Sequence, residues 1–116
     1  MSQFIKICQV SDLIENAGIP ALLGQTPIAL FFVKGRVFAL DNFDPIGEAS
    51  VMSRGIIGSI KGELVVASPL YKQHFNLQTG VCIEQPEVCI EVYSVELRGA
   101  DSGKANDTRE VWVMQP

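Results

Sequence analysis

Two stretches decide the fold: Phe38-Ala39-Leu40-Asp41-Asn42-Phe43-Asp44-Pro45-Ile46-Gly47 and Glu63-Leu64-Val65-Val66-Ala67-Ser68-Pro69-Leu70-Tyr71. Each starts as a run of β-forming residues and then enters a loop at a proline, which restricts the backbone and has no N–H for a neighbouring strand. The hairpins before them are also alike, Val33-Lys34-Gly35-Arg36-Val37 and Ile60-Lys61-Gly62-Glu63-Leu64. We therefore expect the two proline loops to leave the sheet in the same way and to lie side by side.

The rest of the chain also indicates β-structure. Residues 27–33 form a nearly continuous apolar run, which is typical of a strand buried on both faces. Short β-rich segments separated by turns every 8–12 residues favour a sandwich or a small barrel. The other expected strands are residues 4–10, 37–40, 59–60, 64–67, 74–77, 81–83, 88–95 and 110–114, and the polar stretch 99–108 is expected to be a flexible loop.

One short helix is expected after the first strand. Ser11 or Asp12 can cap its start, and Glu15 has capping-box spacing from Asp12. Gly18 and Pro20 would end it after about two turns.

Bulk composition narrows the classes of function. The 116 residues correspond to a single domain, residues 1–116. The net charge of −4, with no basic cluster, argues against nucleic acid as a partner. No apolar run approaches the ~20 residues that span a bilayer, so no membrane association is expected, and the start of the chain lacks signal-peptide features. We expect a cytoplasmic protein whose three cysteines, Cys8, Cys82 and Cys89, are free, buried thiols.

The two proline loops resemble those of Rieske domains. In such domains Cys-Pro-His-x-Gly and Cys-Pro-Leu-His supply two thiolates and two imidazoles to a two-iron, two-sulfur cluster. Here the thiolate positions hold Asp44 and Ser68, and the imidazole positions hold Ile46 and Tyr71. The resemblance implies an all-β fold: a Rieske-like (ISP-type) β-sandwich or barrel, with a degenerate cluster-binding subdomain at about residues 43–84.

A narrower resemblance covers nearly the whole chain. Asn42-Phe43-Asp44-Pro45, Val51-Met52-Ser53-Arg54-Gly55 and Val66-Ala67-Ser68-Pro69-Leu70 are similar to the small subunits of assimilatory NAD(P)H-dependent nitrite reductases. That resemblance implies a non-catalytic subunit that supports a large subunit in reducing nitrite to ammonium. It also implies that FAD, sirohaem and a four-iron cluster belong to the large subunit.

The four degenerate positions predict that this chain binds no cofactor or metal. Ile46 has no donor atom, and Ser68 and Tyr71 would have to lose protons whose pKa lies far above 7. One carboxylate, Asp44, does not anchor a soft sulfide cluster. We expect Asp44 and Ser68 to bond loop amides instead, and Ile46, Leu70 and Tyr71 to form an apolar plug between the sheets.

Other functions stay open at this point. One is a Rieske-type ferredoxin that transfers electrons, and another is a cluster-less Rieske-like docking module of another oxidoreductase. A third is an enzyme that uses Cys82 or Cys89 with His74, although His74 reads as an ordinary strand residue. Phe43, Met52 and Tyr71 are the candidate docking residues.

Overall fold

The computed structural model describes residues 3–99 and 107–116. The chain is built almost entirely from short strands, and the only helical segments in the described part are two single 3-10 turns, η1 (Val10–Asp12) and η2 (Met52–Arg54). In chain order the strands are β1 (Gln3–Gln9), β2 (Ala17–Leu23), β3 (Thr26–Val33), β4 (Arg36–Asp41), β5 (Phe43–Asp44), β6 (Ala49–Ser50), β7 (Ile56–Ile60), β8 (Glu63–Ala67), β9 (His74–Asn76), β10 (Val92–Tyr93), β11 (Val95–Arg98) and β12 (Glu110–Gln115).

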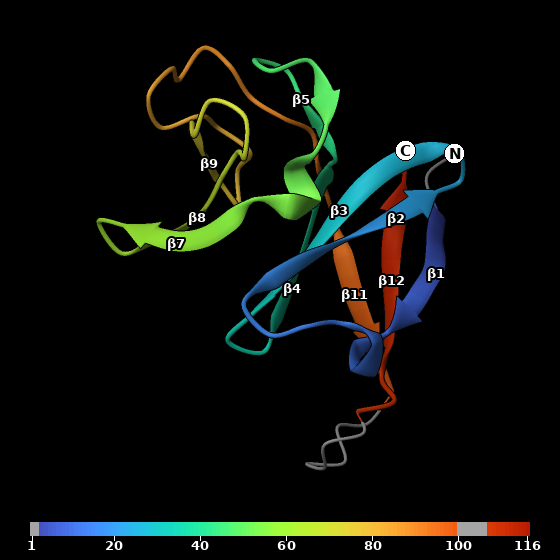
Figure 1. The fold of residues 1–116 in the computed structure, drawn as a ribbon. Helices are drawn as coiled ribbons and strands as arrows, with labels where there is room; N and C mark the ends of the chain where they lie inside the picture. Colours follow the sequence, from blue (N-terminus) through green and yellow to red (C-terminus); the bar gives the residue numbers. More distant parts are fainter. Residues whose placement is uncertain (1–2, 100–106) are drawn as a thin grey trace.

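A central antiparallel sheet, in the order β10-β4-β3-β2, separates two smaller ones (Figure 1). The sheet β1-β12-β11 packs on one side, and the sheet β7-β8-β9 lies on the other. The small ribbon β5-β6 stands beside β7-β8-β9, so that the two proline loops lie at the same end of the molecule. This arrangement confirms the expected all-β class.

Strand β3 is buried on both faces, as its apolar run predicts. Its alternate residues enter two different cores: Ala29, Phe31 and Val33 face the β7-β8-β9 side, whereas Ile28 and Leu30 face the β1-β12-β11 side. Because successive side chains of a strand point in opposite directions, a strand between two cores needs an uninterrupted apolar sequence.

The two similar hairpins close with the same turn. Lys34 and Gly35 join β3 to β4, and Lys61 and Gly62 join β7 to β8. All four have positive φ, with values of 52° and 51° at the lysines. Positive φ at both central residues is the type I′ pattern, whose twist matches that of the flanking strands.

The helix expected after β1 is much shorter than two turns. The chain makes the single turn η1, in which Asp12 accepts a hydrogen bond from the Gln9 N–H at 2.9 Å. Asp12 therefore ends the turn and does not cap a longer helix. Glu15 instead accepts a hydrogen bond from the Lys34 N–H at 3.1 Å.

Strand β2 occupies the residues that were expected to end that helix. Pro20 sits opposite Ala29 in β2, which is the edge strand of its sheet, where a missing N–H costs no ladder bond. Gly18 lies against the carbonyl of Ser53, where a Cβ would come within 2.6 Å of that oxygen. Proline and glycine therefore mark an edge strand and a close contact here.

The expected strands at 81–83 and 88–95 are only partly present. Residues 81–89 pair through isolated bridges, Phe75 with Cys82 and Val81 with Cys89, and regular pairing resumes in β10 and β11. The loop expected at 99–108 falls mostly on residues 100–106, outside the described residues. Within the described part of the chain, no helix is both long and apolar enough to cross a bilayer.

Candidate functional site

The two proline loops have the same internal geometry. In the first, the Glu48 N–H donates to the Asp44 carbonyl at 2.7 Å, and in the second the Lys72 N–H donates to the Ser68 carbonyl at 3.1 Å. Both closing residues have positive φ. The first residue of each loop also accepts a backbone N–H two residues on, from Ile46 to Asp44 Oδ1 at 2.9 Å and from Leu70 to Ser68 Oγ at 3.3 Å.

The loops face each other through the two residues that replace the thiolates. The Ser68 hydroxyl donates a hydrogen bond to Asp44 Oδ2, and both side chains are buried, with relative exposures of 1% and 0%. We call this pair the Asp44–Ser68 clasp. Asp44 Oδ1 also accepts the Gly47 N–H at 3.1 Å, so the buried carboxylate has partners on both oxygens.

Gly47 lets the second loop approach this closely. A Cβ at this position would come within 2.3 Å of Leu70 Cδ1 and 3.0 Å of Asp44 Oδ2. Any larger residue would push the loops apart and strain the Asp44–Ser68 clasp.

The residues at the imidazole positions do not form the expected plug. Tyr71 is 66% exposed and Leu70 is 42% exposed, while Ile46 is half-buried against the neighbouring core. The plug prediction is wrong for Tyr71, whereas Leu70, although partly exposed, places its Cδ1 beside Gly47 of the first loop. Of the candidate docking residues, Phe43 and Tyr71 are exposed, whereas Met52 is fully buried and unsuited to that role.

The residues present do not fit a Rieske cluster. The oxygens of Asp44 and Ser68 are committed to each other and to loop amides, and the Ile46 side chain has only carbon atoms. Tyr71 is the remaining candidate, and a phenol is a poor match for a position that takes an imidazole. Across the described residues, no three metal-ligating side chains gather into a possible site.

His74 and the cysteines do not form a nucleophile–base pair in the described structure. The His74 ring contacts Glu84 Oε2 at 2.6 Å, and the buried Cys82 thiol faces Glu84 Oε1 at 3.7 Å. Burial is the largest influence on the pKa of Glu84 and raises it, but the hydrogen bonds from His74 together lower the pKa below its ordinary value. The Cys82 thiol therefore faces the Glu84 carboxylate, and not the His74 imidazole that would have to act as its base.

All three cysteines are free, but their environments differ. Cys82 is buried as expected, but Cys8 is only half-buried and Cys89 is exposed, so the expectation of three buried thiols holds for Cys82 alone. Burial, and then the nearby Asp12 carboxylate, raises the pKa of the Cys8 thiol to about 11. Cys8 therefore stays a thiol at neutral pH.

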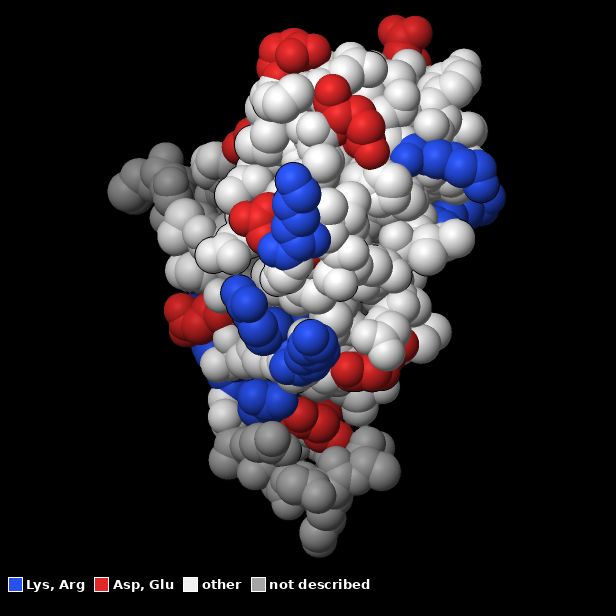
Figure 2. Space-filling view, turned by 90° about the vertical axis from the view of Figure 1, so that its left-hand side faces the viewer, with Lys and Arg blue, Asp and Glu red and all other residues white. Residues whose placement is uncertain are grey.

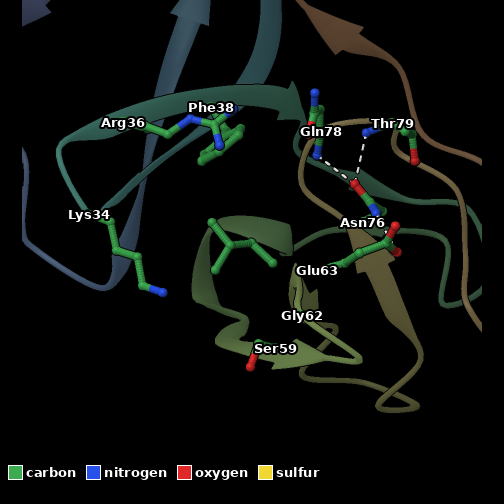
Figure 3. Close-up of a pocket in the computed structure, with 10 residues that line it drawn as sticks. Lys34, Arg36, Phe38, Ser59, Gly62, Glu63, Asn76, Gln78 and Thr79 are labelled. Atoms are coloured by element: carbon green, nitrogen blue, oxygen red, sulfur yellow. Dashed lines mark hydrogen bonds between the residues drawn. The ribbon is translucent and has the colours of Figure 1, made fainter.

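A second site lies at the seam between two sheets and was missed by the sequence interpretation. It is a cavity of about 380 Å³ between the β3–β4 hairpin, the β7–β8 hairpin and the turn after β9 (Figure 3). No local pattern signals it, because Lys61 occupies the same turn position as Lys34 and does not line the cavity. Figure 2 shows Lys and Arg side chains, with Asp and Glu among them, across the middle of this side of the molecule.

Comparison with known proteins agrees with the fold and with the loops. A family model described as a Rieske-like [2Fe-2S] domain matches residues 3–102. The Escherichia coli K12 nitrite reductase (NADH) small subunit is 42% identical over 100 residues, covering 84% of this chain and 93% of that protein. The solution structure of the Escherichia coli protein NirD superposes with a TM-score of 0.80 at 39% identity, covering 99% of this chain and 98% of that one.

A third relative carries a similar sequence inside a much longer chain. The nitrite reductase [NAD(P)H] large subunit of Klebsiella oxytoca is 40% identical over 107 residues, which are 92% of this chain and 10% of that protein. The chain therefore belongs to the Rieske-like [2Fe-2S] domain family and, within it, to the family of nitrite reductase small subunits.

Proposed function

We propose that this chain is the small subunit of an NAD(P)H-dependent nitrite reductase and supports a large subunit in reducing nitrite to ammonium. The observation that carries the proposal is the 42% identity to a nitrite reductase small subunit over 93% of that protein's length. The Klebsiella oxytoca relative supports the choice of partner, because there a 40% identical segment is part of a chain named as the large subunit.

In this proposal the chain contributes no catalytic residue and binds no cluster. The four degenerate positions, Asp44, Ile46, Ser68 and Tyr71, supply no ligand set for a Rieske centre, and the buried Asp44–Ser68 clasp supports a structural role for the loops. Residues 1–116 then act as a single cytoplasmic domain, in which residues 43–84 are a degenerate cluster-binding subdomain. FAD, sirohaem and a four-iron cluster reside in the large subunit, as the sequence resemblance implies.

The ferredoxin alternative requires a redox centre in this chain. Electron transfer through a Rieske domain depends on two thiolates and two imidazoles that hold the cluster. A hydroxyl bonded to a carboxylate has replaced the thiolates here. The replacement of the cluster ligands likewise favours a docking role for this chain. Its relatives support nitrite reductase as the enzyme to which the chain docks.

The test is affinity purification of the tagged chain from cells grown on nitrate, read by absorbance and by mass. We expect a much larger partner chain with the visible absorption of flavin and sirohaem, and no iron or acid-labile sulfide in the isolated small chain. A tagged Rieske ferredoxin with intact cluster ligands, expressed in the same cells, is the control bait. Recovery of the chain without any flavin- and sirohaem-containing partner would refute the proposal.

A further inference from the structure

The cavity at the seam between the sheets has walls of opposite charge. Lys34 and Arg36 come from the β3–β4 hairpin and lie on one side (Figure 3). Glu63 and Asn76 lie on the other side, and Phe38 and Leu64 add apolar surface to the lining. The lining therefore suits a ligand that is anionic at one end and carries an apolar part that can rest between the walls.

The cationic wall is available for a ligand. Neither Lys34 nor Arg36 forms an ion pair with any described residue. The Arg36 guanidinium stands 4.8 Å from the centroid of the Phe38 ring, a cation–π contact that orients it at the edge of the cavity. Arginine in a fixed orientation presents paired donors that match the two oxygens of a carboxylate.

The opposite wall is rigid. Asn76 is buried, and its Oδ1 accepts the N–H groups of Gln78 at 2.8 Å and Thr79 at 3.0 Å. Its Nδ2 donates to Glu63 Oε2 at 3.2 Å, which holds that carboxylate on the far side from the two cations. Glu63 repels an anion on its own side and can accept an N–H from an incoming chain.

The cavity-lining Lys34 has a counterpart of the same backbone geometry in the other hairpin. Lys34 has φ of 52°, a left-handed conformation that Asn, Asp or Gly adopts more readily than lysine. Lys61 has the same place in the other hairpin, with φ of 51°, but does not line the cavity. The chain thus supplies a matched pair of lysines, one at the cavity and one away from it.

We propose that this cavity receives a carboxylate side chain from an acidic, extended segment of the large subunit, an assignment that rests on the proposed function. The carboxylate lies against Lys34 and Arg36, its methylene groups rest on Phe38 and Leu64, and a backbone N–H of the segment donates to Glu63. Such a segment offers a carboxylate to the cationic wall, methylene groups to the apolar surface and a backbone N–H to Glu63. A free small anion uses only the cationic one.

The first experiment compares Lys34→Asn with Lys61→Asn in the full chain. Both changes suit a type I′ turn, so both variants should fold with unchanged or higher melting temperature. We expect Lys34→Asn to weaken binding to the purified large subunit roughly tenfold and to reduce its dependence on salt, with Lys61→Asn within about twofold of the parent chain. Equal effects of the two variants on affinity would overturn the proposal.

The second experiment tests the cavity without the partner. Hexaglutamate is titrated into the ¹⁵N-labelled chain, with acetate at matched carboxylate concentration as the second probe. We expect saturable shifts at the cavity amides with hexaglutamate, lost in Lys34→Asn and kept in Lys61→Asn, and weaker shifts with acetate. Absent shifts, or equal shifts with acetate, would overturn the peptide assignment. If hexaglutamate binds there but no large subunit co-purifies, the proposed function has failed, and the assignment to that partner fails with it.

Discussion

Replacing Ser68 by alanine tests whether the Asp44–Ser68 clasp holds the two proline loops together. The substitution removes the hydroxyl that donates to the buried Asp44 carboxylate and that accepts the Leu70 N–H at 3.3 Å. Alanine has nearly the same shape, so packing changes little. Asp44 keeps its two loop amides but loses the donor on Oδ2.

The size of the effect follows from burial. A hydrogen bond to a charged group contributes about 1.5–3 kcal/mol, and a buried acceptor left without its donor costs the upper part of that range. We expect Ser68→Ala to lower the free energy of unfolding by about 2 kcal/mol. With an unfolding entropy of about 2.1 cal/mol/K per residue, that corresponds to a fall of about 8 °C in the melting temperature.

The assay is urea and thermal unfolding followed by circular dichroism on Ser68→Ala, Asp44→Ala and the double variant. We expect a coupling energy of about 1.5 kcal/mol between the two positions, because each substitution breaks the same contact. Ser53→Ala is the control, since Ser53 is also buried but its hydroxyl bonds no described residue. A Ser68→Ala loss no larger than the control, or additive single effects, would refute the reasoning.

Three further predictions follow from local geometry. Gly18→Ala should destabilise the fold by about 1–3 kcal/mol, because a Cβ would lie 2.6 Å from a buried aromatic ring and from a backbone carbonyl. Gly58→Ala is the control, because an added Cβ there has no atom within 4 Å, and its free energy of unfolding in the same urea assay should stay within about 0.5 kcal/mol of the parent chain. Equal losses of stability in the two variants would contradict this account. Tyr71→Ser should move the melting temperature by less than about 2 °C, since the side chain is 66% exposed; a large drop would revive the apolar plug. The hydrogen bonds from His74 lower the pKa of Glu84 below 4.5, so its contribution to stability is present above about pH 4.5 and is lost as pH falls through the folded-state pKa. The difference in unfolding free energy between the parent chain and Glu84→Gln should therefore shrink between about pH 6 and pH 3 in urea titrations, and a constant difference would count against the ion pair.

Much of the fold is predictable from segments whose local sequence preferences agree with the tertiary structure around them. The run from Pro27 to Val33 reads as a strand buried on both faces, and the structure places it between two cores. The loops at Pro45 and Pro69 are predictable as a pair because both follow β-rich segments and a similar hairpin. Their side-by-side placement, now seen in the Asp44–Ser68 clasp, is confirmed.

The missed features are those in which a distant contact overrides a local rule. Gly18 and Pro20 read as helix stops because nothing nearby in the sequence indicates that they pair with β3 at the edge of a sheet. The hydrogen bond between Asp44 and Ser68 joins positions 24 residues apart, so no local rule predicts it. The only hint in the sequence is that a carboxylate acceptor at one thiolate position and a hydroxyl donor at the other are complementary groups.

The pairing of β1 with β12 sets a limit on how fast this chain can complete its fold. Gln3 lies opposite Gln115, so the pairing closes a loop that contains almost the whole polypeptide, whereas β3–β4 and β7–β8 close through two-residue turns. Short hairpins form within microseconds, but distant partners must first lose the entropy of a long loop. During synthesis, β1 and the core around Val111 and Val113 cannot be completed before β12 has left the ribosome. A chain cut before β12 would leave both β1 and β11 without their hydrogen-bonded neighbour, exposing two strand edges to aggregation.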